Sequence, residues 1–382
     1  MDLLEYQGKQ LFAKHGVAVP EGRHAATVDD AVAAAEEVGF PCVVKAQVAI
    51  GKRGKHGGIK IAKDAAEARE HAEAILGMDI RGFTVHDLWI EGASEIASEY
   101  YASVILDRSE KKLLAMLSAM GGMDVEEMAE EDPKALVKRY IEPDGDFGAE
   151  QAGEIAATAK IDEDVRGAVA ELLVELRDVA IEEDATLIEV NPLIVTEDRK
   201  VVALDSKMTI DNNALYRHED VAEFRDLSSE DPQERLAKEK GLTYVKLDGD
   251  VGILANGAGL CMSTLDVVAQ AGGKPANFLD AGGGSKAEAI VAALEVITSD
   301  PDVKAILFNI FGGITRCDEV AKGIIEATKQ IDIDMPIVVR LDGTNSEEGL
   351  RLLDEAGIEN LSVEKTMLGA AERVVELAGG KS

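Results

Sequence analysis

Cysteine is scarce in this sequence of 382 residues: Cys42, Cys261 and Cys317 lie far apart, and no CxxC pair occurs. An odd number of widely spaced cysteines supports neither a disulfide framework nor a four-ligand zinc site, so a reducing compartment fits best. Long apolar runs are also lacking, since no window approaches the roughly 20 apolar residues of a membrane span. The acidic opening MDLLEYQGKQLFAKHG does not resemble a signal peptide. We therefore expect a soluble, cytoplasmic protein.

Positive charge is the second scarcity. Lys and Arg number 40 against 73 Asp and Glu, which gives a formal net charge of -33. Nucleic acids and anionic membranes both require clustered cations, so neither is expected as the main partner. With 46% hydrophobic residues, the chain is too apolar for a disordered acidic tail. At about 150 residues per domain, the length allows two or three folded domains.

The pattern of the sequence changes near residue 240, where we place a domain boundary. Residues 1–240 mix helical and strand patterns irregularly, which predicts an α+β domain. Residues 241–382 alternate apolar runs, glycine-rich turns and helical segments, and this order predicts βαβ units in a doubly wound parallel sheet. The polar segment 226–240 is interpreted as an exposed connector, with a solvated helix as the alternative.

Hydrophobic periodicity places the individual elements. Helices are expected over residues 3–12, ending at the glycine cap Gly16, and over 28–38 and 162–183. Strands are expected at 41–48, 59–62, 88–91, 100–106 and 113–118, followed by a hairpin over 186–207. In the second domain, strands are expected at 251–255, around Phe278, at 303–310 and at 337–341.

A basic segment interrupts this acidic chain between Phe40 and Lys63, which contains no Asp or Glu. Glycines at 51, 54, 57 and 58 allow backbone N–H groups to approach an anion, and neighbouring cations neutralise it. The pattern predicts a phosphate-binding loop between two strands, and a solvated basic hairpin is the alternative. The loop is not of the GxxxxGK[ST] type. Its cations are Lys45, Lys52, Arg53, Lys55, Lys60 and Lys63.

The predicted hairpin over 186–207 carries a small group of oxygen-bearing side chains. Glu189 and Asn191 are two apart on a strand and share a face. Pairing across a turn near Asp198 brings Asp205 close to Asn191. Hard oxygen ligands of this kind, completed by phosphates and water, commonly hold Mg2+ in nucleotide sites. An ordinary polar hairpin without metal is the alternative.

Three glycine turns follow predicted strands of the second domain, at 256–259, 282–284 and 312–315. Each turn leads into a helix, so unpaired N–H groups and helix dipoles point outward at one edge of the sheet. We expect this edge to bind phosphates or carboxylates, although a single such turn is often structural. No GxSxG elbow occurs, and the six histidines lie outside these turns, so the chain offers no evident phosphate-carrying nucleophile.

Several specific motifs together point to a known family. In order, they are EYQGKQLFAKHGV, VVKAQVAIGKRGKHGG, IEVNPL, NGAGLCMSTLD, PANFLDAGGG and NIFGGITRCDEVAKGI. In order and spacing, they resemble the beta subunits of succinate-CoA ligase (succinyl-CoA synthetase, ADP-forming), along essentially the whole chain. The resemblance implies an ATP-grasp domain over 1–240. It also implies a flavodoxin-like CoA-ligase domain over 241–382 that contacts an alpha subunit, in a heterodimer or heterotetramer.

The family resemblance also implies an activity: reversible conversion of succinyl-CoA, phosphate and ADP to succinate, CoA and ATP, within the tricarboxylic acid cycle. The phosphoryl group passes through a histidine of the alpha subunit, which would also bind most of CoA. This division explains why the present chain has phosphate-binding loops but no nucleophile of its own.

Site roles follow from the same resemblance. The nucleotide phosphates would be held by Lys45, Lys52, Arg53 and Gly54. The base and ribose would be lined by Glu91, Ser94 and Glu99. Mg2+ would be bound by Asn191 and Asp205, and Glu189 would orient the partner's histidine as the catalytic carboxylate. Succinate would be bound by Asn256, Gly313, Ile314 and Thr315.

The sequence departs from the family pattern in the phosphate loop, where Ile50 and Lys52 stand in place of an alanine and a glycine. ATP is favoured over GTP as the nucleotide. Three alternatives stay open at this stage: a malate-CoA ligase beta subunit, a non-catalytic nucleotide-binding scaffold, and a stand-alone ATP-grasp carboxylate-amine ligase.

Overall fold

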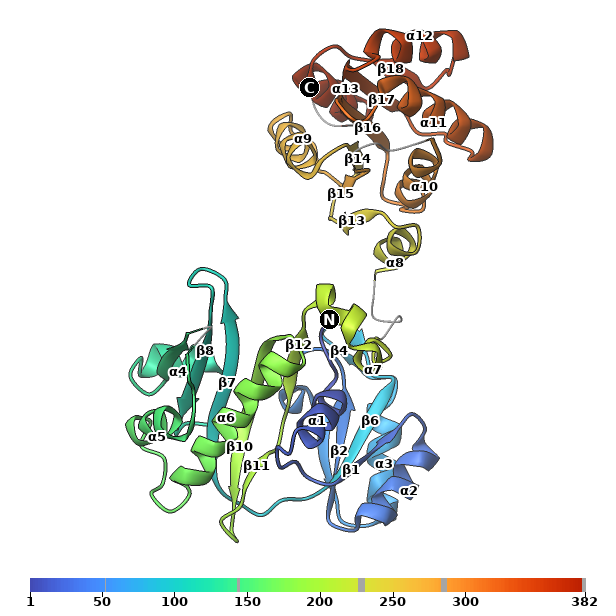
Figure 1. Ribbon diagram of the computed structural model, residues 1–382. Coiled ribbons are helices and arrows are strands. Elements are labelled where there is room, and N and C mark those ends of the chain that lie inside the picture. The colour runs from blue at the N-terminus through green and yellow to red at the C-terminus, as the bar shows by residue number, and fades with distance from the viewer. Residues whose placement is uncertain (52, 143–144, 226–230, 283–286, 380–382) are drawn as a thin grey trace. The chain divides into compact units, whose positions relative to one another are not determined.

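The computed structural model describes residues 1–382 except 52, 143–144, 226–230, 283–286 and 380–382, together with the side chains of 126, 129 and 131. The chain forms two compact units, Met1–Arg225 and Asp226–Ser382 (Figure 1). They divide at Arg225 rather than near residue 240. The reason is that α8 (Pro232–Glu239) contacts β13 (Thr243–Lys246) and α10 (Ala287–Thr298) of the second unit.

The first sheet of unit 1 is antiparallel, with strand order β1-β6-β2-β3. Its strands are β1 (Gly22–Ala25), β2 (Cys42–Gln47), β3 (Ile59–Ala62) and β6 (Asp87–Gly92). The helices α2 (Val28–Val38) and α3 (Ala65–Ile75) pack on it through small alanine side chains such as Ala31 and Ala68. The β2–β3 hairpin confirms the two strands predicted around the basic loop.

The second sheet of unit 1 has the order β11-β10-β7-β8-β9, with β12 also paired to β10. Its helices α5 (Ala149–Thr158) and α6 (Arg166–Glu182) share a core with the sheet. The sequence did not predict β9 or α5. The strands are β7 (Ile96–Asp107), β8 (Lys112–Ser118), β9 (Val137–Ile141), β10 (Ala185–Thr196), β11 (Val201–Ala203) and β12 (Lys207–Ile210). Smaller elements complete the unit: β4 (Asp79–Ile80), β5 (Phe83–Thr84), α4 (Val125–Glu131), α7 (Glu219–Ala222), and the 3-10 turns Gly54–His56 and Asn212–Arg217.

Helix α1 (Glu5–Lys14) contacts the second sheet at β12 and is linked to the first at β2. Leu11 and Phe12 anchor it in the core of the second sheet. The contact is close at Gly8, because a Cβ at that position would lie 2.2 Å from Ser206 Oγ. This close contact fixes the distance between the N-terminal half of α1 and the segment around Ser206.

Replacing Gly8 by Ala is expected to lower the free energy of unfolding, although alanine favours a helix over glycine by about 1 kcal/mol. The added methyl group overpacks the Ser206 contact, and such strain costs roughly 1–3 kcal/mol. Urea unfolding measures the change, with Gly153→Ala in α5 as control. A Cβ at Gly153 meets no atom within 4 Å, so that control should gain stability. A stabilised Gly8→Ala variant would show that α1 is not packed as tightly as described.

Unit 2 is a twisted sheet of order β13-β15-β14-β16-β17-β18, in which β14 to β18 run parallel and β13 antiparallel. In chain order the parallel strands run 2-1-3-4-5, which is the flavodoxin-like arrangement and confirms the predicted fold class. Apolar clusters cover both faces of the sheet. The strands are β14 (Val251–Ala255), β15 (Asn277–Asp280), β16 (Ala305–Gly312), β17 (Ile337–Gly343) and β18 (Leu361–Val363). The helices besides α8 and α10 are α9 (Ala258–Gln270), α11 (Cys317–Gln330), α12 (Ser346–Ala356) and α13 (Met367–Leu377).

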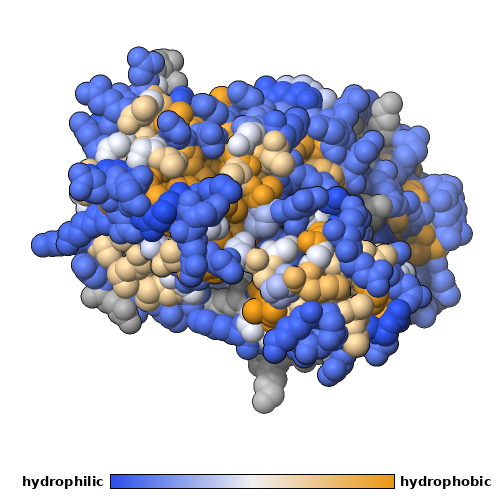
Figure 2. All heavy atoms as spheres, turned by 90° about the horizontal axis from the view of Figure 1, so that it is seen from below, coloured by the Kyte–Doolittle hydropathy of each residue, from blue (hydrophilic) through white to orange (hydrophobic). Residues whose placement is uncertain are grey.

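Hydrophilic residues cover most of the face shown in Figure 2, and apolar residues form smaller areas between them. Within the described residues, no helix combines the length and apolar character that crossing a membrane requires.

Candidate active site

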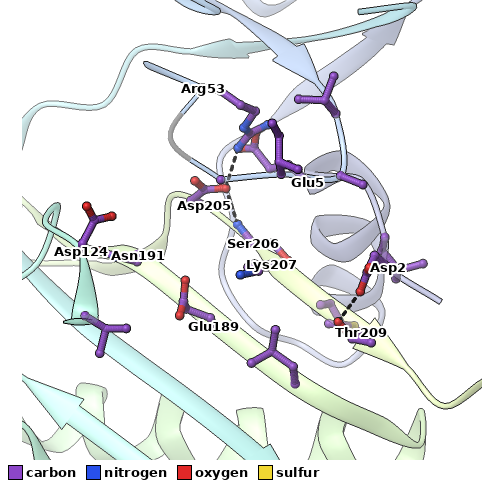
Figure 3. A pocket seen from close by; sticks show the side chains of 18 of the residues that line it. Asp2, Glu5, Arg53, Asp124, Glu189, Asn191, Asp205, Ser206, Lys207 and Thr209 are labelled. Atoms are coloured by element: carbon purple, nitrogen blue, oxygen red, sulfur yellow. Dashed lines mark hydrogen bonds and ion pairs between the residues drawn. The ribbon is translucent and has the colours of Figure 1, made fainter. Parts of the chain in front are cut away.

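A cavity of about 670 Å³ opens in unit 1 (Figure 3). Its walls come from six segments: the start of the chain with the first residue of α1, the loop after β2, Arg81, the start of α4, strand β10, and residues 205–209, which include most of β12. Its volume lies in the range of small-molecule binding sites. Among its lining residues are Glu5, Gly51, Arg53, Glu189, Asn191 and Asp205.

Asn191 and Asp205 both line this cavity. β10 pairs Leu193 with Ala203 and Glu189 with Lys207, so the same register places Asn191 opposite Asp205. The Asn191 side chain is held by the turn before α4, because Gly122 N donates to its Oδ1 at 2.9 Å and its Nδ2 donates to Met123 O at 2.8 Å. The hairpin geometry predicted from the sequence is therefore present.

The donor set at this position fits Mg2+. Asp205 offers a carboxylate whose side chain is 33% exposed toward the cavity, and Asn191 offers an amide oxygen beside it. Within the described residues, no three His, Cys, Asp or Glu side chains gather into a metal cluster. One or two protein oxygens, with the remaining positions left to phosphate and water, are typical of Mg2+ in nucleotide sites.

Glu189 lies on the same cavity wall (Figure 3). Its Oε2 accepts a hydrogen bond of 3.1 Å from the Tyr101 hydroxyl on β7. The tyrosine hydroxyl thereby steadies a carboxylate that lines the cavity.

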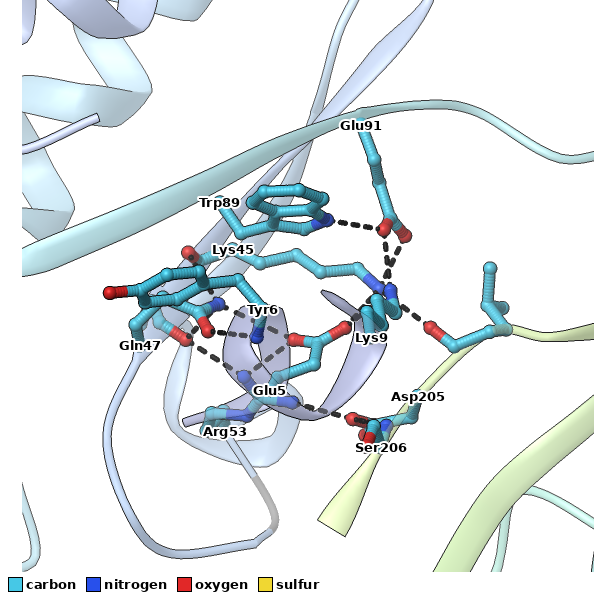
Figure 4. A network of polar contacts seen from close by, with 12 residues as sticks. Glu5, Tyr6, Lys9, Lys45, Gln47, Arg53, Trp89, Glu91, Asp205 and Ser206 are labelled. Atoms are coloured by element: carbon cyan, nitrogen blue, oxygen red, sulfur yellow. Dashed lines mark hydrogen bonds and ion pairs between the residues drawn. The ribbon is translucent and has the colours of Figure 1, made fainter. Parts of the chain in front are cut away.

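Behind the cavity lies a buried ion cluster, which we define as Glu5, Lys9, Lys45, Arg53, Glu91 and Asp205 (Figure 4). Lys45 Nζ contacts Glu91 Oε1 at 2.5 Å, Glu5 Oε1 at 2.9 Å and the carbonyl of Leu204 at 3.1 Å. Its three ammonium hydrogens therefore all have acceptors. A phosphate can reach Lys45 only if one of these contacts is exchanged or shared.

Arg53 links this cluster to the cavity. Its Nη2 contacts Asp205 Oδ1 at 2.9 Å, and its Nη1 contacts Glu5 Oε2 at 2.6 Å and donates to the carbonyl of Ala46 at 3.0 Å. The guanidinium side chain is only 6% exposed, yet it lines the cavity. It is a fixed cation at the position where the sequence predicts phosphate binding.

The ion pairs determine the protonation of the cluster. Burial opposes the charge on Glu5, but Arg53, Lys45 and Lys9 outweigh it and hold the Glu5 pKa well below its usual range. Burial likewise opposes the charge on Lys45, and the carboxylates of Glu5 and Glu91 outweigh it and raise the Lys45 pKa. For Asp205, burial raises the pKa, and the attraction of Arg53 offsets this only in part.

The other residues predicted to bind the nucleotide do not belong to the described lining of the cavity. Glu91 is fully buried, and its carboxylate receives Lys9, Lys45 and the Trp89 indole N–H, so it belongs to the ion cluster. Gly54 opens the 3-10 turn next to the cavity, and Lys52 lies outside the described residues. Ser94 and Glu99 lie after β6 and on β7, outside the described lining of the cavity.

Sequence reasoning missed two members of the cluster, Glu5 and Lys9. Each side chain is only 1% exposed. A signal was present: positions 5, 9 and 12 recur at helical spacing, so both charges lie on the face of α1 that also carries the buried Phe12. Charges aligned with a buried aromatic residue indicate a buried ion pair rather than a solvated surface.

The predicted succinate residues lie at the carboxyl edge of the unit 2 sheet. Asn256 follows β14 and exchanges two hydrogen bonds of 2.9 Å with the backbone of Phe311 on β16. This contact spans the neighbouring strands β14 and β16, between which the strand order reverses, and ligands of such sheets bind at this point. Gly313 and Ile314 are exposed there, with Ile314 at 87%, whereas Thr315 is buried.

Two of the three glycine turns at this edge are occupied by a carboxylate of the chain itself. Asp280 Oδ1 accepts from Gly257 N at 2.6 Å and from Gly282 N at 2.8 Å. These two amides therefore bind a carboxylate of the chain itself, and the binding of a ligand's phosphate or carboxylate at this edge stays a prediction. Gly283 and Gly284 lie outside the described residues.

Comparison with known proteins covers the whole chain. Residues 2–195 match the ATP-grasp domain family, and residues 254–374 match the CoA-ligase family. The chain is 52% identical over 382 residues to the succinate–CoA ligase [ADP-forming] subunit beta of Rubrobacter xylanophilus, and 49% identical over 379 residues to those of Halorubrum lacusprofundi and Natronomonas pharaonis. Each alignment covers 99% of both chains.

A solved structure of similar fold is ATP citrate lyase from Methanothrix soehngenii in complex with citrate and coenzyme A. It aligns with a TM-score of 0.76 and 20% identity, over 99% of this chain and 98% of that one. At this identity, the likeness concerns the fold alone, and it extends through both units.

Proposed function

This chain belongs to the family of ADP-forming succinate–CoA ligase beta subunits, and from that premise we propose that it converts succinyl-CoA, phosphate and ADP reversibly to succinate, CoA and ATP together with an alpha subunit. The observation that carries the proposal is the cavity of unit 1. The fixed cation Arg53 lines this cavity together with the side-chain oxygens of Asn191 and Asp205. Such an arrangement is suited to binding a nucleotide polyphosphate with Mg2+.

In phosphoryl transfer, the protein contributes chiefly by positioning the reacting groups and by stabilising the negative charge of the phosphates. Arg53 and Lys45 would neutralise the phosphates, with Gly54 and Lys52 in the adjoining loop, while Asn191 and Asp205 would hold Mg2+. When bound, the metal would neutralise charge on the phosphate oxygens. Glu91, Ser94 and Glu99 would serve the base and ribose of ADP or ATP.

Glu189 would act on the partner subunit. A carboxylate that accepts the N–H of an imidazole fixes its tautomer and orientation, and Glu189 is a carboxylate of the cavity wall that Tyr101 steadies. The histidine that carries the phosphoryl group would come from the alpha subunit, which would also bind most of CoA.

Unit 2 and the alpha subunit would together form the site for succinate. Asn256 and the backbone amides of Gly313, Ile314 and Thr315 would bind one carboxylate of succinate at the switch point of the sheet. The exposed apolar side chains of Phe311 and Ile314 beside them suit contact with another subunit. We propose assembly as an alpha-beta heterodimer or heterotetramer in the cytoplasm.

The test is acid-dependent ADP formation from ATP and CoA by the chain reconstituted with a candidate alpha subunit. Turnover with succinate that disappears when the alpha subunit is omitted is the expected result, and ATP is expected to exceed GTP. Turnover with malate but not succinate would show that malate is the substrate. Turnover without the alpha subunit would place the phosphoryl-carrying residue in this chain.

A further inference from the structure

We propose that Glu5 is a positioning residue of the nucleotide site, whose carboxylate, held by Lys9, sets Lys45 and Arg53 in the places from which they meet the phosphates. The inference rests on the proposed function, because the phosphates concerned are those of its nucleotide. It adds helix α1 to the two segments, the basic loop and the β10–β12 hairpin, that the sequence assigns to the site.

Each oxygen of the Glu5 carboxylate contacts one of the two cations proposed to bind phosphate. Oε1 contacts Lys45 Nζ at 2.9 Å, and Oε2 contacts Arg53 Nη1 at 2.6 Å. Because the two contacts use different oxygens, the rigid carboxylate sets the separation and direction of the cations. Glu5 also lines the cavity, so this bridge lies at the wall where the phosphates would bind.

Lys9 is buried more deeply than Lys45: its side chain is 1% exposed against 7%, and neither lysine belongs to the described lining of the cavity. Lys9 Nζ lies 2.7 Å from Glu5 Oε1 and 2.5 Å from Glu91 Oε2. It therefore serves as a counter-ion to two carboxylates that each also bind Lys45. A buried charge kept in this way fixes geometry more than it adds stability, since desolvation offsets much of the Coulomb gain.

The main chain of α1 keeps Glu5 in place. The residue begins the helix, where its negative charge is favoured by the helix dipole. One residue later, Tyr6 N donates to Gln47 Oε1 on β2 at 3.1 Å, and Gly8 rests against Ser206. The helix thus joins the strand that carries Lys45 to the segment that carries Asp205.

The charge of Glu5 argues against a role in affinity. A carboxylate beside the phosphate site repels phosphate, so a site built only for tight binding would omit it. Without Glu5, Lys9, Lys45 and Arg53 would face the carboxylates of Glu91 and Asp205 with an uncompensated positive charge, and the two working cations would lose their common anchor. Removal of Glu5 is therefore expected to lower the rate without weakening ADP binding.

The experiment compares Glu5→Gln with wild type in the complex reconstituted with an alpha subunit. We expect kcat to fall about 100-fold, the size of loss that follows a misplacement of about 1 Å. The KM for ADP should stay equal or decrease, and Glu5→Asp should restore part of kcat. The matched control is Lys14→Met at the other end of α1, which breaks ion pairs with Glu183 and Asp220 outside the cavity and should leave kcat unchanged.

Trp89 gives a second readout that does not depend on turnover. It is the single tryptophan of the chain, and its indole N–H donates to Glu91 within the ion cluster at 2.8 Å. In the full-length chain, Glu5→Gln is expected to change Trp89 emission before nucleotide is added, and to reduce its response to ADP with Mg2+. Lys14→Met should reproduce the wild-type emission.

The outcomes separate the two proposals. An active wild-type complex whose kcat and Trp89 emission survive Glu5→Gln would overturn the positioning role alone. So would equal losses in Glu5→Gln and Lys14→Met, because they would show that α1 acts only through stability. A wild-type complex inactive with succinate and malate would overturn the proposed function, and the Trp89 comparison would still decide whether Glu5 orders the cluster.

Discussion

Replacing Asp205 by Asn is expected to reduce turnover of the reconstituted complex by about 100-fold to 1000-fold, the loss typical of removing one preorganised electrostatic group. The substitution keeps the shape of the side chain but removes the charge that faces Arg53 and would bind Mg2+. Assembly should survive, because the side chain is one third exposed and Arg53 retains Glu5 as an anionic partner. Steady-state turnover as a function of Mg2+ concentration measures the effect, and more Mg2+ should be required.

Asp2→Asn is the matched control for this prediction. Asp2 lines the same cavity, where its Oδ1 accepts from the Thr209 hydroxyl at 2.6 Å. Losing this charge should change turnover only slightly, because Asp2 belongs to neither the ion cluster nor the proposed metal site. Equal losses in the two variants would mean that the cavity needs overall negative charge rather than a carboxylate at position 205. Full activity of Asp205→Asn at ordinary Mg2+ would remove Asp205 from the metal site.

Replacing Lys45 by Met is expected to abolish measurable turnover and also to destabilise unit 1. Breaking a buried ion pair by removing one partner costs about 3–5 kcal/mol, and here Glu5 and Glu91 both lose Lys45. Urea unfolding of the full chain should show the loss. Lys60→Met, on the neighbouring strand β3, removes a charge of the same basic segment and should change stability by less than about 0.5 kcal/mol.

The same variant should alter the response to acid. The cations hold the folded-state pKa of Glu5 well below its unfolded value, so Glu5 contributes stability above about pH 4.3 that is lost as the pH falls toward its folded pKa. Lys45→Met removes one of these cations and raises that pKa. The variant should therefore lose the contribution of Glu5 at a higher pH than wild type does. A difference in unfolding free energy between the variant and wild type that does not change with pH would show that Lys45 does not set the charge of Glu5.

The parts of the fold that the sequence predicted are those with a strong local pattern. The apolar run of β16 and the alanine-rich helix α2 need no tertiary information, and α2 was predicted with both ends correct. The register of the β10 hairpin was also predictable, because the turn near Asp198 sets which residues face each other. Some short elements were missed: β13 and β18 have only four and three residues, and over such lengths the alternation of apolar and polar residues is a weak signal.

The site residues that the sequence predicted likewise belong to local patterns, and those that it missed do not. Asp205 and Asn191 were identified because they belong to one hairpin, and Arg53 because it belongs to one loop. Glu5 and Lys9 were missed because a Glu–Lys pair four residues apart on a helix is commonly a solvated surface pair. Their burial depends on side chains from residues 45, 53 and 91, which no local pattern connects to the first helix.

The ion cluster has a consequence for the order in which the chain is synthesised. Arg53 and Asp205 stand 152 positions apart in the chain, yet their side chains form an ion pair. While the chain is being made, Lys9, Lys45 and Arg53 emerge long before the segment that carries Asp205, so the complete cluster cannot close until translation has passed this segment. A fragment that ends between the basic loop and the β10–β12 hairpin therefore contains Lys9, Lys45 and Arg53 but lacks Asp205, the partner of Arg53.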